Sequence, residues 1–216
     1  LICNDKQLFV PTGRTPFRAF SKSDGATLAK LGSSNPWGQR LHGGCFGVIV
    51  DNKLAAGPSE DGHIDIFTKN MSMARFPALQ LISAADQTYV LTTGSLKKID
   101  RTKLLSPKKK RRQASAMAIW KTKTPGARCM AKAAELIFVG GANWLKAVST
   151  TTGQELWSQG LKGNVASIAL VKNLLLAATE DGVIHCFKTG KQKKIRVNLL
   201  NPDTAGGSVE PLNKEM

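Results

Sequence analysis

Short apolar runs alternate with turn-forming residues along most of the chain. The clearest stretch covers residues 133–187, where apolar runs are separated by Gly, Asp-Gly or Thr-Gly at close intervals. This pattern is typical of small antiparallel strands joined by tight turns. Asp-Gly closes a hairpin because glycine accepts positive φ, and the residues that follow alternate between the two faces of a sheet. The sequence therefore predicts an all-β chain.

The apolar runs recur as a repeat of about 40 residues. Five segments align on an apolar strand, and their starts are 46, 35, 47 and 38 residues apart. They are residues 5–13 (DKQLFVPTG), 51–59 (DNKLAAGPS), 86–94 (DQTYVLTTG), 133–141 (AAELIFVGG) and 171–179 (VKNLLLAAT). Each is followed by a second strand. Residues 60–67 (EDGHIDIF) and 180–187 (EDGVIHCF) share five of eight positions, which indicates the same turn and strand.

Two further elements complete each repeat. Residues 21–28 (SKSDGATL) align with residues 149–156 (STTTGQEL), with Gly25 and Gly153 in the same place. A fourth element precedes the aligned strand at residues 44–50, 79–84, 127–132 and 165–170. Four short antiparallel strands per repeat predict a β-propeller, because one four-stranded blade cannot bury both faces and is stabilised by stacking. A β-sandwich would not repeat the same eight residues.

We predict about five blades over residues 1–187. Residues 188–216 are basic and polar and then rich in turn formers, so we expect a tail or linker there. The chain begins with Leu1 in what looks like the middle of a strand. We therefore expect it to be a fragment, with further blades upstream or a ring closed by a partner chain.

One turn carries a resemblance to a known family. Thr152, Gly153 and Trp157 form a Thr-Gly-x-x-x-Trp pattern. Together with residues 163–187, this stretch resembles the pyrroloquinoline-quinone-like repeat of quinoprotein β-propellers, and the resemblance extends weakly over residues 1–187. It implies that Trp157 packs against the neighbouring blade. The first repeat departs from the pattern, since Ala29 stands where Trp157 would be, and Trp120 is the counterpart in the third repeat. The repeat signature comprises Asp61, Gly62, Gly153, Trp157, Asp181 and Gly182.

The charge balance favours anionic partners. The chain has 31 Lys and Arg against 15 Asp and Glu, a net charge of +16. Such an excess attracts polyanions or acidic surfaces, but salt screens the attraction over about 8 Å. Lys108, Lys109, Lys110, Arg111 and Arg112 form one run without interleaved aromatic residues for base stacking. We expect a solvated loop there and no specific nucleic acid. A polyanion-binding module that uses this run for phosphate or acidic lipid is the weakest alternative.

The resemblance also brings quinone-dependent dehydrogenases into consideration. Those enzymes hold calcium with carboxylates and amides and commonly carry two adjacent cysteines. In this chain the cysteines are far apart, at Cys3, Cys45, Cys129 and Cys186, and the histidines occupy different places in their repeats, at His42, His63 and His185. The aspartates fall in turns or before strands, at Asp5, Asp24, Asp51, Asp61, Asp86 and Asp181. Local hydrogen bonding explains such positions. No catalytic residue, metal ligand or cofactor-binding residue is assigned.

We therefore expect a non-catalytic propeller scaffold that binds a protein or ligand, like the non-enzymatic members of this family in the bacterial envelope. A protein partner and a periplasmic, cell-envelope or secreted location follow from the resemblance. The chain has no run of about 18 apolar residues that could span a membrane. The alternative is part of a quinone-dependent oxidoreductase, with pyrroloquinoline quinone and calcium bound in blades outside this sequence.

Overall fold

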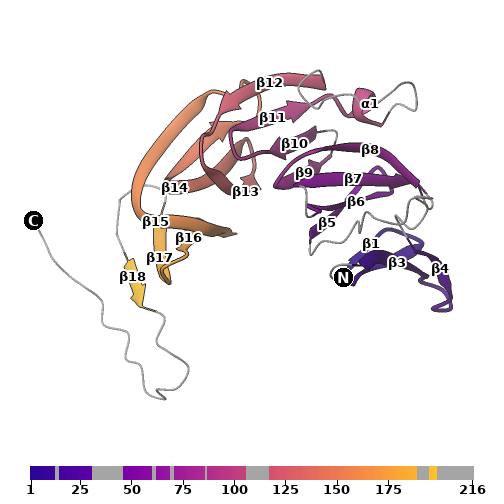
Figure 1. The fold of residues 1–216 in the computed structure, drawn as a ribbon. Helices are drawn as coiled ribbons and strands as arrows, with labels where there is room; N and C mark the ends of the chain where they lie inside the picture. The colour runs from indigo at the N-terminus through magenta and orange to yellow at the C-terminus, as the bar shows by residue number, and fades with distance from the viewer. Residues whose placement is uncertain are drawn as a thin grey trace, which may run out of the picture. The chain divides into compact units, whose positions relative to one another are not determined.

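The computed structural model describes residues 1–12, 15–30, 46–59, 62–68, 71–85, 87–105, 117–188 and 195–198. The chain forms two compact units, Leu1–Lys123 and Thr124–Met216. Strands dominate both of them (Figure 1). Across the described residues, no helix has the length and apolarity needed to cross a bilayer.

The first unit contains three four-stranded antiparallel sheets. The first sheet consists of β1 (Ile2–Cys3), β2 (Gln7–Thr12), β3 (Thr15–Ser21) and β4 (Thr27–Lys30). The second consists of β5 (Phe46–Val50), β6 (Lys53–Gly57), β7 (His63–Thr68) and β8 (Met71–Pro77). The third consists of β9 (Gln80–Ala84), β10 (Gln87–Leu91), β11 (Ser95–Ile99) and β12 (Ala118–Lys123), and a short helix α1 (Arg101–Leu104) follows β11. Strands that are neighbours in the chain are hydrogen-bonded neighbours within each sheet.

The second sheet buries both of its faces. On one face Ala55 and Ile66, which are cross-strand partners, join a core with Val90 of the third sheet. On the other face the next pair along, Leu54 and Phe67, joins a core with Phe9 of the first sheet. Successive residues of a strand point to opposite faces, so a continuous apolar run is what a sheet packed on both sides requires. This is why the strands of the second sheet are apolar at neighbouring positions.

The second unit is a six-stranded antiparallel sheet. Its strands are β13 (Ala127–Ala133), β14 (Leu136–Ser149), β15 (Glu155–Val171), β16 (Leu174–Thr179), β17 (Val183–Lys188) and β18 (Ile195–Asn198). β14 would span roughly 46 Å if it were straight. However, the Thr150 N–H donates to the carbonyl of Glu135 at 3.0 Å, so the two ends of β14 lie side by side and the strand folds back on itself. The bend lies near Asn143, which has a φ of 66°.

The second unit therefore holds two four-stranded repeats. The first is made of β13, the two halves of β14 and the start of β15, where Ala147 pairs with Trp157. The second is made of the end of β15, where Val171 pairs with Leu174, and of β16, β17 and β18. Gly163, with a φ of 89°, lies in β15 between the two parts. Together with the three sheets of the first unit, the described residues form five four-stranded repeats, as the sequence predicts.

The expected boundary at Phe187 needs correction. β18 pairs with β17, with Ile184 opposite Val197, so the last sheet continues into the stretch that we expected to be a tail. This segment supplies the fourth strand of its repeat. The sequence pattern did not reveal it, because four residues within a basic stretch are too few to show a strand's alternation. Residues 189–194 and 199–216 lie outside the described part of the chain.

Candidate functional site

Two aligned turns have the same backbone geometry. Gly25 and Gly153 both have a φ of 74° and donate to the carbonyls of Ser21 and Ser149, respectively, at 3.0 Å. In both turns the serine N–H is also bonded, to Ala26 in one case and to Gln154 in the other. The hydroxyl of Ser21 lowers the pKa of the exposed Asp24 carboxyl. The Ser21 hydroxyl and the Asp24 carboxyl thus interact with each other within the turn.

The Asp-Gly turns are also a matched pair. Gly62 and Gly182 have φ values of 73° and 81°, and they donate to the carbonyls of Ser59 and Thr179 at 2.8 and 3.1 Å. The Thr179 hydroxyl holds the pKa of Asp181 below its ordinary value by hydrogen bonding to the carboxylate. Asp181 is thus a turn residue. Its counterpart Asp61 lies outside the described residues.

The other sequence candidates do not assemble into a site in the described part of the chain. The basic run of Lys108, Lys109, Lys110, Arg111 and Arg112 lies outside it, as do His42, Cys45 and Asp86. His63 is in β7 and His185 is in β17, in separate units. Within the described ranges, no three His, Cys, Asp or Glu side chains are grouped so that they could hold a metal ion.

The second unit contains a pocket that sequence reasoning missed. Its volume is about 430 Å³, and both repeats of the unit contribute to its wall. Phe138 and Trp157 come from the first repeat, whereas Leu170, Leu175 and Phe187 come from the second. Leu175 belongs to a small buried cluster that includes Leu145 and Val165, and the other four side chains pack against this cluster. The two repeats therefore pack together at their centre and leave an apolar space beside it.

Trp157 is one of three aromatic residues in the described wall of the pocket. Its ring meets the ring of Phe187 edge to face, with 5.5 Å between centroids and 76° between planes. This is a favourable arrangement for two aromatic rings. The contact joins β15 of one repeat to β17 of the next. Trp120, by contrast, has its ring 5.9 Å from Tyr89, which belongs to its own sheet.

The charged groups of the pocket are both lysines. Lys172 lies in the turn between β15 and β16, and Lys188 ends β17; both are exposed. The described lining includes no Asp or Glu, and the other polar side chains there are Gln159 and Asn173. Lys146 in the same unit is different, because its Nζ lies 2.7 Å from Glu155 Oε2 and its hydrogen bond lowers the pKa of that carboxyl. The pocket is thus an apolar space with a positive rim.

Solved structures with a similar fold include propellers. The structure of BamB from Moraxella catarrhalis superposes with a TM-score of 0.63 and 15% identity, over 91% of this chain and 59% of that one. The computationally designed Ika8 protein gives 0.64 and 14%, over 91% and 59%. The WD40 β-propeller domain of Doa1 gives 0.60 and 13%, over 92% and 67%. The fold is a β-propeller. This chain spans about three fifths of the BamB and Ika8 chains. No family model and no curated protein matches the sequence.

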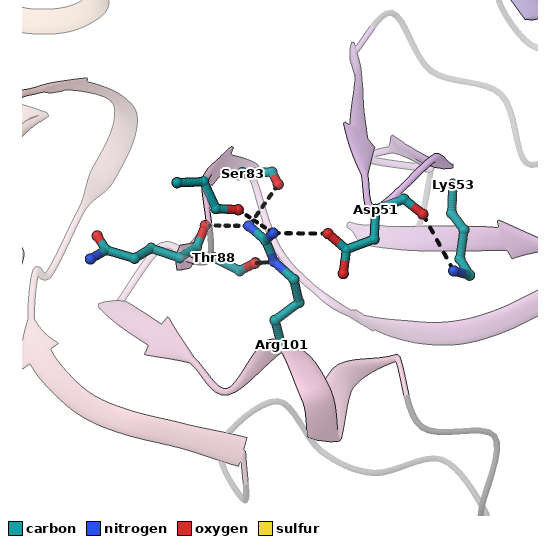
Figure 2. A network of polar contacts seen from close by, with 7 residues as sticks. Asp51, Lys53, Ser83, Thr88 and Arg101 are labelled. Carbon is teal, nitrogen blue, oxygen red and sulfur yellow. Dashed lines mark hydrogen bonds and ion pairs between the residues drawn. The ribbon is translucent and has the colours of Figure 1, made fainter. Parts of the chain in front are cut away.

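Sequence reasoning also missed a polar clasp between the second and third blades. Figure 2 shows the guanidinium of Arg101 among acceptors from both blades. Its Nη1 donates to Asp51 Oδ1 at 2.9 Å and to the Ala85 carbonyl. Its remaining donors reach the hydroxyls of Thr88 and Ser83, each at 3.0 Å, and the Gln87 carbonyl at 2.7 Å. All five N–H donors of the side chain are used, so the group is structural.

The thiols that the structure describes differ in accessibility. Cys129 and Cys186 are buried in strands, whereas Cys3 is exposed. The Cys129 Sγ lies 3.7 Å from the carbonyl of Val165, and burial raises the pKa of this thiol to about 11. A protonated thiol is a poor nucleophile. Cys129 is therefore a core residue, and Cys186 contributes to the pocket wall as a small apolar group.

Proposed function

We propose that this chain is part of a non-catalytic β-propeller scaffold that binds a protein or ligand, resembling pyrroloquinoline-quinone-like repeat proteins of the bacterial envelope. The supporting observation is the apolar pocket between the fourth and fifth blades, with its aromatic wall and positive rim. Ligand sites are typically concave and apolar with a few polar groups that set orientation. In this proposal, the stacked blades hold the binding surface in place, and any catalytic activity belongs to the partner.

The proposal includes a protein partner and no cofactor. It places the protein in the periplasm, the cell envelope or the extracellular space, and this part rests on the repeat resemblance carried by Thr152, Gly153 and Trp157. The high positive charge of +16 supports an acidic partner surface through long-range attraction.

The oxidoreductase alternative requires calcium and pyrroloquinoline quinone. The described carboxylates do not fit that ligand set. Asp65 is buried, but its Oδ2 is 3.2 Å from Arg75 Nη1, and Asp24 and Asp181 are used in turns. Any calcium ligands would therefore have to come from elsewhere in the protein. The polyanion alternative rests on Lys108 to Arg112, and replacing these five residues with Ser should then abolish heparin binding.

Two measurements on the intact protein test the proposal. Chemical cross-linking in the producing cells, read by mass spectrometry, should give reproducible links to one partner protein. Calorimetric titration with pyrroloquinoline quinone and calcium should give no binding heat in a folded sample. Tight calcium-dependent quinone binding would overturn the scaffold reading, and so would cross-linking that yields no partner.

A further inference from the structure

We infer that the pocket between the fourth and fifth blades takes a peptide segment of the partner protein in which a large apolar side chain is flanked by a carboxylate. The apolar side chain would enter against Trp157 and Phe187, and the carboxylate would lie beside Lys172 or Lys188. This inference rests on the proposed function and deepens it, because it names the binding surface and the chemistry of the segment that binds.

The wall of the pocket selects for an apolar group. Trp157, Phe138 and Phe187 are only partly buried, although each packs against the buried cluster of the second unit. Their remaining surface faces the pocket, whose volume of about 430 Å³ lies in the range of small ligand sites. Partly exposed aromatic groups in a concave site are the groups that anchor a partner's apolar side chain.

The rim selects for negative charge. Lys172 and Lys188 are the charged residues of the described lining, and neither has a carboxylate partner among the described residues. Lysines in this unit do find internal acids where these are available, as Lys146 does with Glu155. Lys172 also holds a φ of 54°, which is uncommon for a residue other than glycine, asparagine or aspartate. Two unneutralised ammonium groups beside an apolar space complement an acidic group attached to an apolar one.

The polar groups of the pocket favour a peptide over a fatty acid. Gln159 and Asn173 place amide groups beside the apolar wall. Gln159 Nε2 already donates to the Gly160 carbonyl at 2.9 Å, and its second N–H and its oxygen, like the Asn173 amide, can donate to and accept from a peptide backbone. An acyl chain has one carboxylate and otherwise offers nothing to these amides. A peptide can satisfy the amides, the lysines and the aromatic wall together. We therefore assign the pocket to a peptide, and fatty-acid binding is the competing result.

The test uses peptides selected from a random display library on the intact protein. Selection should enrich sequences with Leu, Phe or Trp next to Asp or Glu. Fluorescence anisotropy with one labelled, enriched peptide then measures affinity. Lys172→Glu and Lys188→Glu should each weaken binding by about tenfold, with a further loss in the double variant, and higher salt should weaken binding to the unaltered protein. Replacing the acidic residues of the peptide with amides should reproduce that loss.

Lys162→Glu is the matched control. Lys162 is an exposed lysine of β15 that does not line the pocket, so its charge reversal should leave the affinity unchanged. Circular dichroism and urea unfolding check that every variant is folded. Equal losses in Lys162→Glu and Lys172→Glu would overturn the inference, as would unaltered binding in both pocket variants. Competition by oleate but by no acidic peptide would also overturn it. A cross-linked partner that contacts another surface would overturn the inference that the pocket binds the peptide, but it would agree with the proposed scaffold function.

Discussion

Two contacts between blades in this molecule are built in different ways. Between the second and third blades, eleven buried residues form one apolar cluster, and the Arg101 clasp joins the same two blades. Between the fourth and fifth blades, five buried residues form the cluster, and a pocket of about 430 Å³ lies beside it. Both contacts use short antiparallel strands of similar sequence pattern. The second contact has the smaller cluster and has the pocket beside it.

The difference indicates a division between stability and binding. A closed apolar contact excludes water and gains the full benefit of burial, whereas a cavity forfeits part of that benefit because its lining loses contacts. Proteins commonly give up stability at sites that bind a ligand. The contact between the second and third blades therefore stabilises the first unit, and in the proposed function the open contact in the second unit is the surface that a partner binds.

The largest expected effect is in the closed contact. Ile66→Ala removes atoms from a fully buried position and should lower the free energy of unfolding by about 3 kcal/mol. Leu175→Ala, in the wall of the pocket, should cost about half as much, because the space beside it is already open. Urea unfolding followed by circular dichroism measures both. An equal cost at the two positions would show that the fourth and fifth blades are as tightly joined as the second and third.

A smaller effect separates the parts of the polar clasp. Arg101→Lys should cost about 2 kcal/mol, because an ammonium group cannot satisfy five acceptors that the guanidinium reaches. The Arg101 side chain is 11% exposed, but its partner Asp51 is 49% exposed. Asp51→Asn should therefore cost less than about 1 kcal/mol, as is usual for an ion pair open to solvent. The same unfolding assay checks the pair, and a larger cost for Asp51→Asn would place the energy of the clasp in its charge pair.

A third effect, of modest size, should be the same in both regions. Gly62 and Gly182 have positive φ, and an added Cβ would meet no atom within 4 Å at either position. Gly62→Ala and Gly182→Ala should each cost about 1 kcal/mol, because only the backbone conformation is penalised. Differential scanning calorimetry of the two variants tests this. Clearly different melting shifts would mean that the turns are coupled to the blade contacts around them.

The parts of the fold that could be predicted from the sequence are those formed by residues close together in the chain. The turn at Gly25 and the turn at Gly153 align by sequence at shared Ser, Gly and Leu positions, and their hydrogen bonds match. A hairpin needs glycine at the residue with positive φ, so the sequence carries that information directly. The fold-back of β14 agrees with the repeat pattern, in which the aligned segment at residues 133–141 is followed by a second strand. β18 was missed, since four residues in a basic stretch carry too little pattern.

The candidate site could not be derived in the same way. The pocket lies beside the buried cluster that contains Leu145 and Val165, and its wall includes Trp157 and Phe187, whose rings meet across the two repeats. No spacing along the chain encodes that space. The Arg101 clasp has the same character, because its acceptors lie 13 to 50 residues away and include backbone carbonyls that any residue would supply. Long-range geometry of this kind appears only when the sheets are placed.

The Arg101 clasp also has a mechanical consequence. One side chain ties the turn after β5 to the turn between β9 and β10, at the ends of two stacked sheets. A force that pulls these turns apart is carried by one hydrogen bond, from Arg101 to Asp51, because the other bonds of the guanidinium stay within the third blade. Under tension, the clasp should therefore open at Asp51 first, and the guanidinium should stay attached to the third blade.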